Sequence, residues 1–150
     1  MRYKATVVEM PDLLLAACKA RSFPDGIKDA WDRLEARMPS LKGRHFYGLT
    51  VCEGGELVYY AAVQVAGEDE AAALGFPLLR VRGGRCARVK LLDWPHHVDE
   101  IGAVFDELMR NFPMAPDAPT VEYYRSESEL HLLVPLAEGA QDGEAPAVPK

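Results

Sequence analysis

The sequence has few cysteines, an excess of acidic over basic residues, and no long apolar run. Three cysteines in 150 residues are typical of a protein from a reducing compartment rather than of a disulfide framework. The formal net charge of −6 argues against direct binding of nucleic acid, because phosphate contacts need clustered Lys and Arg. No apolar run approaches the roughly 20 residues that span a bilayer. We therefore expect a cytoplasmic protein that contacts neither membrane nor nucleic acid.

Spacings that mark common metal and catalytic sites are also absent. There is no CxxC or HxxxH pair, and the adjacent His96 and His97 diverge on a helix, which makes them a poor metal pair. The sequence contains no GxSxG motif, no Ser-His-Asp arrangement and no phosphate-binding loop. We predict that the protein binds no metal and uses no cofactor.

Length and apolar periodicity predict one α+β domain over residues 1–137. Apolar residues at helical spacing predict helices over 27–38 and 98–112, ended by Pro39 and Pro113. Strands are predicted at 3–9, 13–21, 45–53, 57–66, 120–124 and 130–136, with a further hairpin within 76–93. Residues 67–75 are predicted to be an acidic, alanine-rich connector, and 138–150 a disordered tail.

The two halves of the chain, about 1–67 and 76–137, show the same order of features. Four residues around the first helix recur near the second at an offset of 74, and Phe23-Pro24 recurs as Trp94-Pro95. The four pairs are Trp31 with Phe105, Leu34 with Leu108, Met38 with Phe112, and Pro39 with Pro113. This pattern predicts tandem pseudo-symmetric hairpin–helix–strand–strand repeats, with antiparallel sheets, both helices on one side, and a ligand cleft between the halves.

A carboxylate stands inside an aromatic strand near the end of the domain. In Thr120-Val121-Glu122-Tyr123-Tyr124, alternation directs Glu122 and Tyr124 to one face of the sheet and Val121 and Tyr123 to the other. A charge in so apolar a strand needs a partner, since burying it alone is costly. An offset of 75, one more than around the helices, places Tyr47 opposite Glu122, so the two are predicted to be equivalent positions that face one cleft.

These motifs resemble the GyrI-like small-molecule-binding domain, which also serves as the effector domain of AraC-type and MerR-type multidrug regulators. The resemblance spans roughly residues 3–137 and rests on short motifs: Phe46-Tyr47-Gly48, Tyr59 before Ala61-Ala62-Val63, Gly84-Arg85, Val121 to Tyr124, and Val134-Pro135. It implies that Glu122 meets cationic or polar ligands while Tyr47, Tyr59 and Tyr124 stack on flat rings. Cys86 stands where the family usually has Tyr, which removes one possible wall of the cleft.

Three functions stay open at this point. The first is a stand-alone protein that binds and sequesters small aromatic or cationic molecules through Glu122 and the tyrosines. The second is a hydrolase of cyclopropane-bearing or similar compounds, as some members of the resembled family are, with Glu122 as general acid or base. The third is a protein-interaction inhibitor of a DNA-handling enzyme. The sequence does not predict an oligomeric state.

Overall fold

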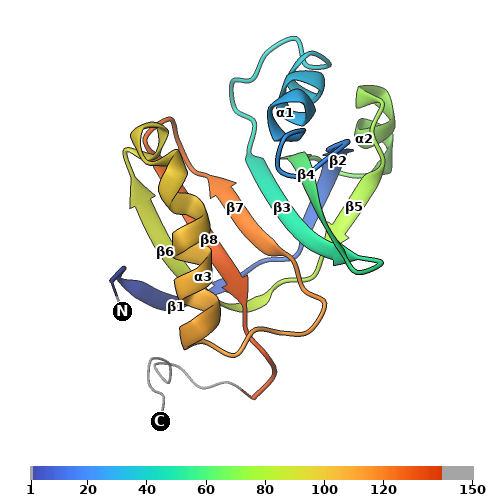
Figure 1. The fold of residues 1–150 in the computed structure, drawn as a ribbon. Helices are drawn as coiled ribbons and strands as arrows, with labels where there is room; N and C mark the ends of the chain where they lie inside the picture. The colour runs from blue at the N-terminus through green and yellow to red at the C-terminus, as the bar shows by residue number, and fades with distance from the viewer. Residues whose placement is uncertain (1, 140–150) are drawn as a thin grey trace. The chain divides into compact units, whose positions relative to one another are not determined.

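The computed structural model describes residues 2–139, which form eight strands and three α-helices. The predicted α+β class is therefore confirmed, and Figure 1 shows the arrangement of the elements within each part of the chain. The chain divides into two compact units. Unit 1 contains Met1–Pro11 and Gly83–Lys150, and unit 2 contains Asp12–Arg82.

Unit 1 is a four-stranded antiparallel sheet with one α-helix on one face. Its strands follow the order β1 (Ala5–Met10), β6 (Gly84–Leu92), β8 (Glu129–Pro135) and β7 (Thr120–Tyr124). Helix α3 (Ile101–Asn111) follows two short 3-10 turns, η1 (Trp94–His96) and η2 (Val98–Glu100). Its apolar stripe packs against alternate residues of β6 and β8, so one face of the sheet and one face of the helix form a single core.

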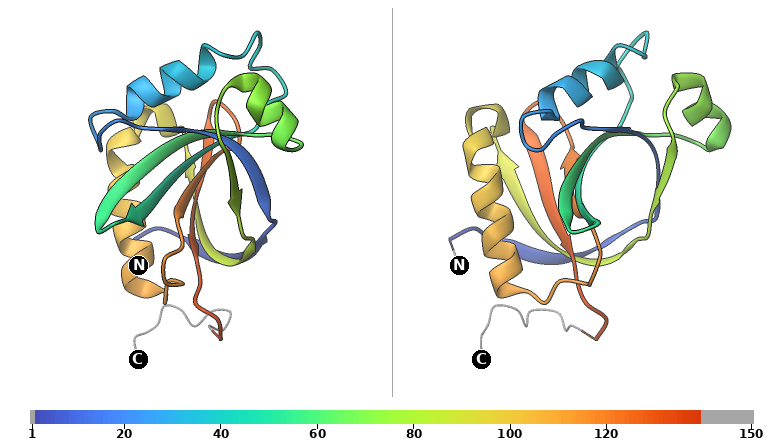
Figure 2. Two further views of the ribbon diagram at one scale, coloured as in Figure 1. Left: turned by 90° about the vertical axis from the view of Figure 1, so that its right-hand side faces the viewer. Right: turned by 45° about the vertical axis from the view of Figure 1, so that its right-hand side comes forward.

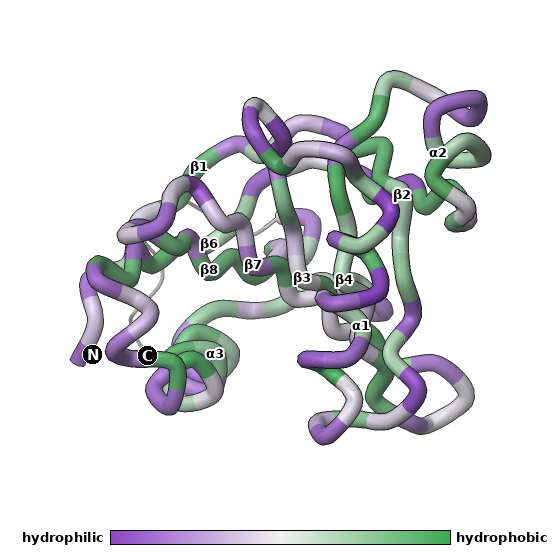
Figure 3. Tube along the Cα trace, turned by 90° about the horizontal axis from the view of Figure 1, so that it is seen from above, coloured by the Kyte–Doolittle hydropathy of each residue, from purple (hydrophilic) through white to green (hydrophobic). Residues whose placement is uncertain are grey.

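Of the stripe that the sequence predicts for unit 1, Phe105, Leu108 and Phe112 are buried and Ile101 is partly buried, and Val104 is buried in addition. Val104, Phe105 and Leu108 of α3 and the following Phe112 contact Leu130, Leu132 and Val134 of β8 in one apolar cluster. Figure 3 shows that α3 carries both hydrophobic and hydrophilic segments along its turns. This amphipathic pattern explains why the helix packs on the sheet with one side only.

Unit 2 repeats the plan of a four-stranded antiparallel sheet covered on one face by helix. The strand order is β3 (Phe46–Glu53), β4 (Glu56–Gln64), β2 (Leu13–Lys19) and β5 (Leu78–Val81). Helix α1 (Ile27–Glu35) buries Ala30 and Leu34 against β2 and β4. Helix α1 ends at Glu35, three residues before the predicted end at Met38, although Met38 is still buried in the same cluster.

Helix α2 (Glu68–Leu74) occupies the segment predicted to be a connector, and this prediction is wrong. The helix lies beside β2 and β5 (Figure 2) and buries Ala71 and Leu74 in the unit 2 core. Gly75, with φ 86°, ends it in the left-handed conformation that favours glycine, and Arg37 Nε donates to the Leu74 carbonyl at 2.9 Å. Seven residues are too few for periodicity to distinguish a helix from a loop.

The predicted hairpin of strands 45–53 and 57–66 is confirmed, since β3 pairs with β4. The hairpins predicted within 3–21 and within 76–93 are wrong, because their strands pair with other partners. β1 pairs with β6, while β2 pairs with β4 on one edge and β5 on the other. β6 likewise pairs with β1 and β8, not with β5. Each compact unit therefore combines strands from both predicted halves of the sequence. The alternation of side chains identifies a strand but not its neighbours, which are selected by burial against residues distant in sequence.

The remaining predictions on the ends of the chain fall largely outside the described residues. Of the predicted tail at 138–150, only residues 138 and 139 belong to the described part. Within residues 2–139, none of the helices combines the length and the apolar character that crossing a bilayer requires.

Candidate functional site

Strand β7 places Glu122 and Tyr124 on the face of the unit 1 sheet that carries α3. Glu122 pairs across the ladder with Leu132 and Tyr124 with Leu130, and both leucines belong to the core cluster that contains α3. Val121 and Tyr123 pair with Leu133 and His131 on the other face. The predicted alternation along this strand is therefore confirmed.

Glu122 is a buried carboxylate in contact with a phenol. Its exposed fraction is 8%, and it is the one charged or polar side chain that is buried among residues 2–139. The Tyr124 hydroxyl donates a hydrogen bond to Glu122 Oε1 at 2.6 Å. A carboxylate accepts hydrogen bonds on both oxygens, since each oxygen has two lone pairs. It can therefore attract a cation, or exchange a proton with a bound molecule.

Trp94 of unit 1 packs against the tyrosine of this carboxylate–phenol pair, and the predicted site residues do not include it. Its indole ring meets the Tyr124 ring edge to face, with centroids 5.1 Å apart, and its Nε1 donates to the Ser126 carbonyl at 3.1 Å. The correspondence of Trp94-Pro95 with Phe23-Pro24 was the available signal, because it put an aromatic residue at the same place in each half.

Tyr59 lies in unit 2 within an aromatic cluster on the helix-bearing face of its sheet. Trp31 Nε1 donates to the Tyr59 hydroxyl at 3.0 Å, and the Phe23 ring stacks on Tyr59 at 6.4 Å with an interplanar angle of 20°. Phe46 meets Trp31 edge to face at 6.0 Å. Tyr59 itself is 2% exposed, whereas Phe23 is 39% exposed, so Phe23 is the ring of this pair with substantial exposed surface.

Tyr47 occupies a different position from the one the repeat offset predicts. It pairs with Ala62, whereas Tyr59, Ala61 and Val63 of the same sheet pack against α1. Tyr47 thus lies on the face of the unit 2 sheet opposite α1, while Glu122 lies on the α3 side of unit 1. The predicted equivalence of Tyr47 and Glu122 is wrong, because an offset that is off by one residue moves a strand side chain to the other face.

The structure thus brings two of the four predicted site residues into direct contact. Glu122 and Tyr124 form a hydrogen-bonded pair in unit 1, while Tyr47 and Tyr59 belong to unit 2 and lie on opposite faces of its sheet. Within residues 2–139, no group of three or more His, Cys, Asp or Glu side chains is arranged to hold a metal ion.

The three cysteines differ in environment, and this gives a direct chemical test of the structure. Cys18 and Cys86 are buried and Cys52 is exposed. Burial raises the pKa of the Cys86 thiol to about 11 and also raises the pKa of Cys18. Since the thiolate is the reactive form, we expect Ellman's reagent at pH 8 to modify one thiol rapidly in the native protein and three after unfolding. Cys52→Ser should remove the rapid phase; rapid reaction of two or three thiols in the native protein would contradict these placements.

Comparisons with known proteins give fold-level matches only. No family model and no curated protein matches the sequence. An integron cassette protein from the mobile metagenome of Vibrio cholerae matches with a TM-score of 0.66 and 12% identity, over 91% of this chain and 95% of that one. SAV2435, solved bound to tetraphenylphosphonium, matches with a TM-score of 0.63 and 15% identity, over 92% and 95%. A hydrolase from Listeria innocua matches with a TM-score of 0.51 and 14% identity, over 90% and 92%.

These matches cover nearly the whole of the described chain and almost all of each compared protein. They confirm the GyrI-like fold that the sequence motifs predict. At identities of 12% to 15% the likeness establishes the fold and not the activity.

Proposed function

We propose that this chain binds small aromatic cations and that Glu122 supplies the negative charge that selects them. The observation that carries the proposal is the burial of Glu122 at 8% exposure, with the Tyr124 hydroxyl 2.6 Å from one of its oxygens. A carboxylate with little access to water interacts more strongly with a ligand cation than an exposed one, because the local dielectric constant is lower. The aromatic rings of Tyr124 and Trp94 add surface suited to a flat or cationic group.

The likeness to SAV2435 supports this ligand class, since that protein was solved with tetraphenylphosphonium bound. Tetraphenylphosphonium combines one delocalised positive charge with four phenyl rings and has no hydrogen-bond donor. Recognition of such a molecule depends on charge and on ring contacts. Sequestration of toxic cations is the role that we infer from binding alone.

The direct test is calorimetric titration of the purified protein with tetraphenylphosphonium, beside a thermal-shift measurement. We expect saturable binding and a rise in the unfolding temperature. A ligand at 100 times its Kd stabilises the native state by about 2.7 kcal/mol. The uncharged triphenylphosphine oxide, of related shape, should bind more weakly. Absence of saturable binding to tetraphenylphosphonium and to planar aromatic cations would contradict the proposal.

Hydrolysis is the second candidate function, favoured by the same carboxylate and by the fold match to the Listeria innocua hydrolase. A buried carboxyl group beside a phenol can act as a general acid or base. Incubation of the protein with cyclopropane-bearing compounds, followed by mass spectrometry, tests this function. Product formed in proportion to enzyme concentration would support it, and unchanged compounds after prolonged incubation would exclude hydrolysis of those compounds.

A further inference from the structure

The face of the unit 1 sheet opposite α3 carries a row of cationic side chains on β6. Ala87, Val89 and Leu91 of this strand are buried in the core with α3, so the intervening Arg88 and Lys90 point to the other face. Lys90 is exposed and Arg88 is partly exposed. The chain as a whole has a net charge of −6, so this row is positively charged in a protein whose net charge is negative.

Neighbouring strands add ring and hydroxyl groups to the row. Lys90 pairs with His131 of β8, which pairs in turn with Tyr123 of β7, and the His131 and Tyr123 rings meet edge to face at 5.6 Å. On the other side of the row, Arg88 pairs with Thr6 of β1, and its Nη2 donates to Thr6 Oγ1 at 3.4 Å. Cations, rings and a hydroxyl from four strands therefore share one face.

One acidic side chain on this face, that of Glu129, already has a histidine as its partner. His131 Nε2 lies 2.6 Å from Glu129 Oε2. This hydrogen bond, and then the nearby positive charges of His131, Lys90 and Arg125, hold the pKa of Glu129 below its usual range. Glu129 therefore stays ionised and paired with His131, and among residues 2–139 it forms no ion pair within 4.0 Å with Lys90 or Arg88.

The cations of the row retain binding capacity. Within residues 2–139, Lys90 makes no side-chain hydrogen bond and no ion pair within 4.0 Å. Arg88 makes one side-chain hydrogen bond within the same residues, from Nη2 to Thr6 Oγ1, so its Nη1 donors are unused; its Nε–H also lacks an acceptor but is shielded from water. A guanidinium with unused donors and a nearby ammonium form a favourable environment for an oxyanion.

We propose that this face binds a small phosphate-bearing ligand, with Arg88 and Lys90 as the phosphate contacts. Side chains two residues apart on one strand are separated by about 6.6 Å, and neighbouring strands by about 4.8 Å. The row and its flanks therefore cover on the order of 200 Å², far below the roughly 800 Å² that each partner buries in a stable protein interface. This area fits a diphosphate group, and the Tyr123 and His131 rings lie where a planar base attached to it would be held.

Titration of ¹⁵N-labelled protein with sodium pyrophosphate, ADP or adenosine, at constant ionic strength, tests the proposal. We expect pyrophosphate and ADP to shift the backbone amide signals of β6 and β8 in a saturable way. Tighter binding of ADP than of pyrophosphate would show that the protein also contacts the base. Equal binding would show that the protein recognises the phosphates alone. Saturable shifts with adenosine alone, or shifts that avoid β6 and β8, would overturn the proposal.

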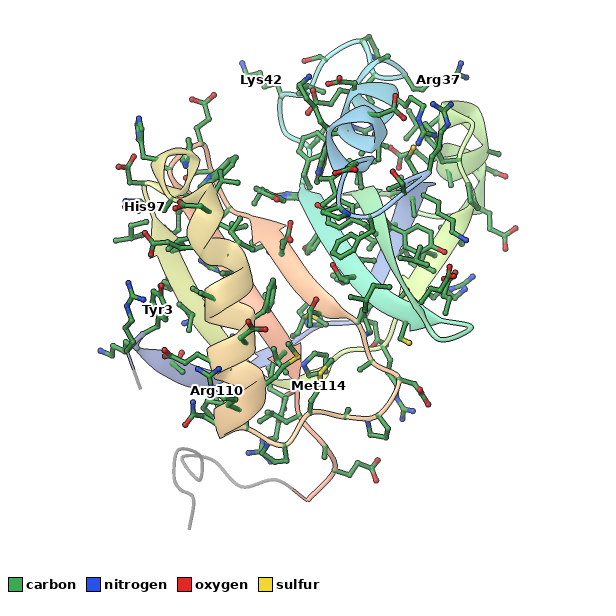
Figure 4. All side chains as sticks on the ribbon, viewed as in Figure 1. Tyr3, Arg37, Lys42, His97, Arg110 and Met114 are labelled. Atoms are coloured by element: carbon green, nitrogen blue, oxygen red, sulfur yellow. The ribbon has the colours of Figure 1, made fainter. Side chains whose placement is uncertain are left out.

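Substitutions separate local recognition from general charge. Arg88→Gln and Lys90→Gln should each weaken pyrophosphate binding about three- to tenfold, since each removes one partly exposed charge contact. Arg110→Gln, on α3 of the same unit (Figure 4), removes the same charge and should leave binding unchanged. An equal loss in all three variants would show that only net charge matters, and would overturn the assignment to β6. The amide spectra of each variant without ligand verify its fold.

Discussion

Glu122→Gln should weaken binding of tetraphenylphosphonium by about 10- to 100-fold, which corresponds to about 1.4–2.8 kcal/mol. The substitution keeps the shape of the side chain and removes its charge. A unit charge pair about 5 Å apart is worth roughly 3 kcal/mol at an effective dielectric constant near 20, and this sets the upper end of the range. The neutral triphenylphosphine oxide should lose much less affinity, because its ring contacts do not depend on the carboxylate.

The stability of the Glu122→Gln variant should stay within about 1 kcal/mol of the parent protein. The glutamine Oε1 can still accept the hydrogen bond that Tyr124 donates at 2.6 Å to the carboxylate. Loss of affinity can then be assigned to the missing charge and not to unfolding. Urea denaturation of both proteins measures this difference.

Glu127→Gln is the matched control, because it removes the same charge from an exposed position between β7 and β8. We expect its affinity for tetraphenylphosphonium to stay within about twofold of the parent, as screened surface charges contribute little. If Glu122→Gln and Glu127→Gln bind equally well, Glu122 takes no part in ligand recognition and the proposed function loses its main support.

The same variant distinguishes a binding protein from a hydrolase. If Glu122 acts as a general acid or base, Glu122→Gln should abolish turnover of a substrate while leaving its binding largely intact. If Glu122 acts only through its charge, the loss appears in binding and there is no turnover to remove. Titration and product analysis on one preparation measure both quantities.

Leu108→Ala should have the largest effect on stability, a loss of about 2–5 kcal/mol in the free energy of unfolding. Leu108 is fully buried between α3 and the unit 1 sheet. Its truncation removes apolar contacts and leaves a cavity that close-packed neighbours fill only in part. The strand that carries Glu122 pairs with β8, which contributes to the same core, so affinity for the ligand should fall as well.

Met109→Ala is the control for this substitution, since Met109 follows Leu108 on the helix and is 42% exposed. Alanine has a higher helix propensity than methionine, and the lost contact area is small. We expect a change below about 0.5 kcal/mol. Chemical denaturation of the two variants gives the comparison, and similar losses would mean that the described burial of α3 is wrong.

The sequence by itself determined the local structure wherever a pattern is long and regular. The apolar stripes of α1 and α3 identify both helices, and alternation in Thr120–Tyr124 correctly directs Glu122 and Tyr124 to one face. It also predicted the fold through short motifs that resemble GyrI-like domains. These signals depend on neighbours a few residues apart, where periodicity and propensity operate.

Tertiary structure alone decided which strands pair and which face each tyrosine occupies. β1 pairs with β6, and β2 pairs with β5, through contacts between residues more than 60 positions apart. A one-residue error in aligning the halves reversed the face predicted for Tyr47. The contact of Trp94 with Tyr124 follows from packing that no local pattern encodes. Register and pairing are set by the burial of whole faces, and this free energy appears only when distant segments meet.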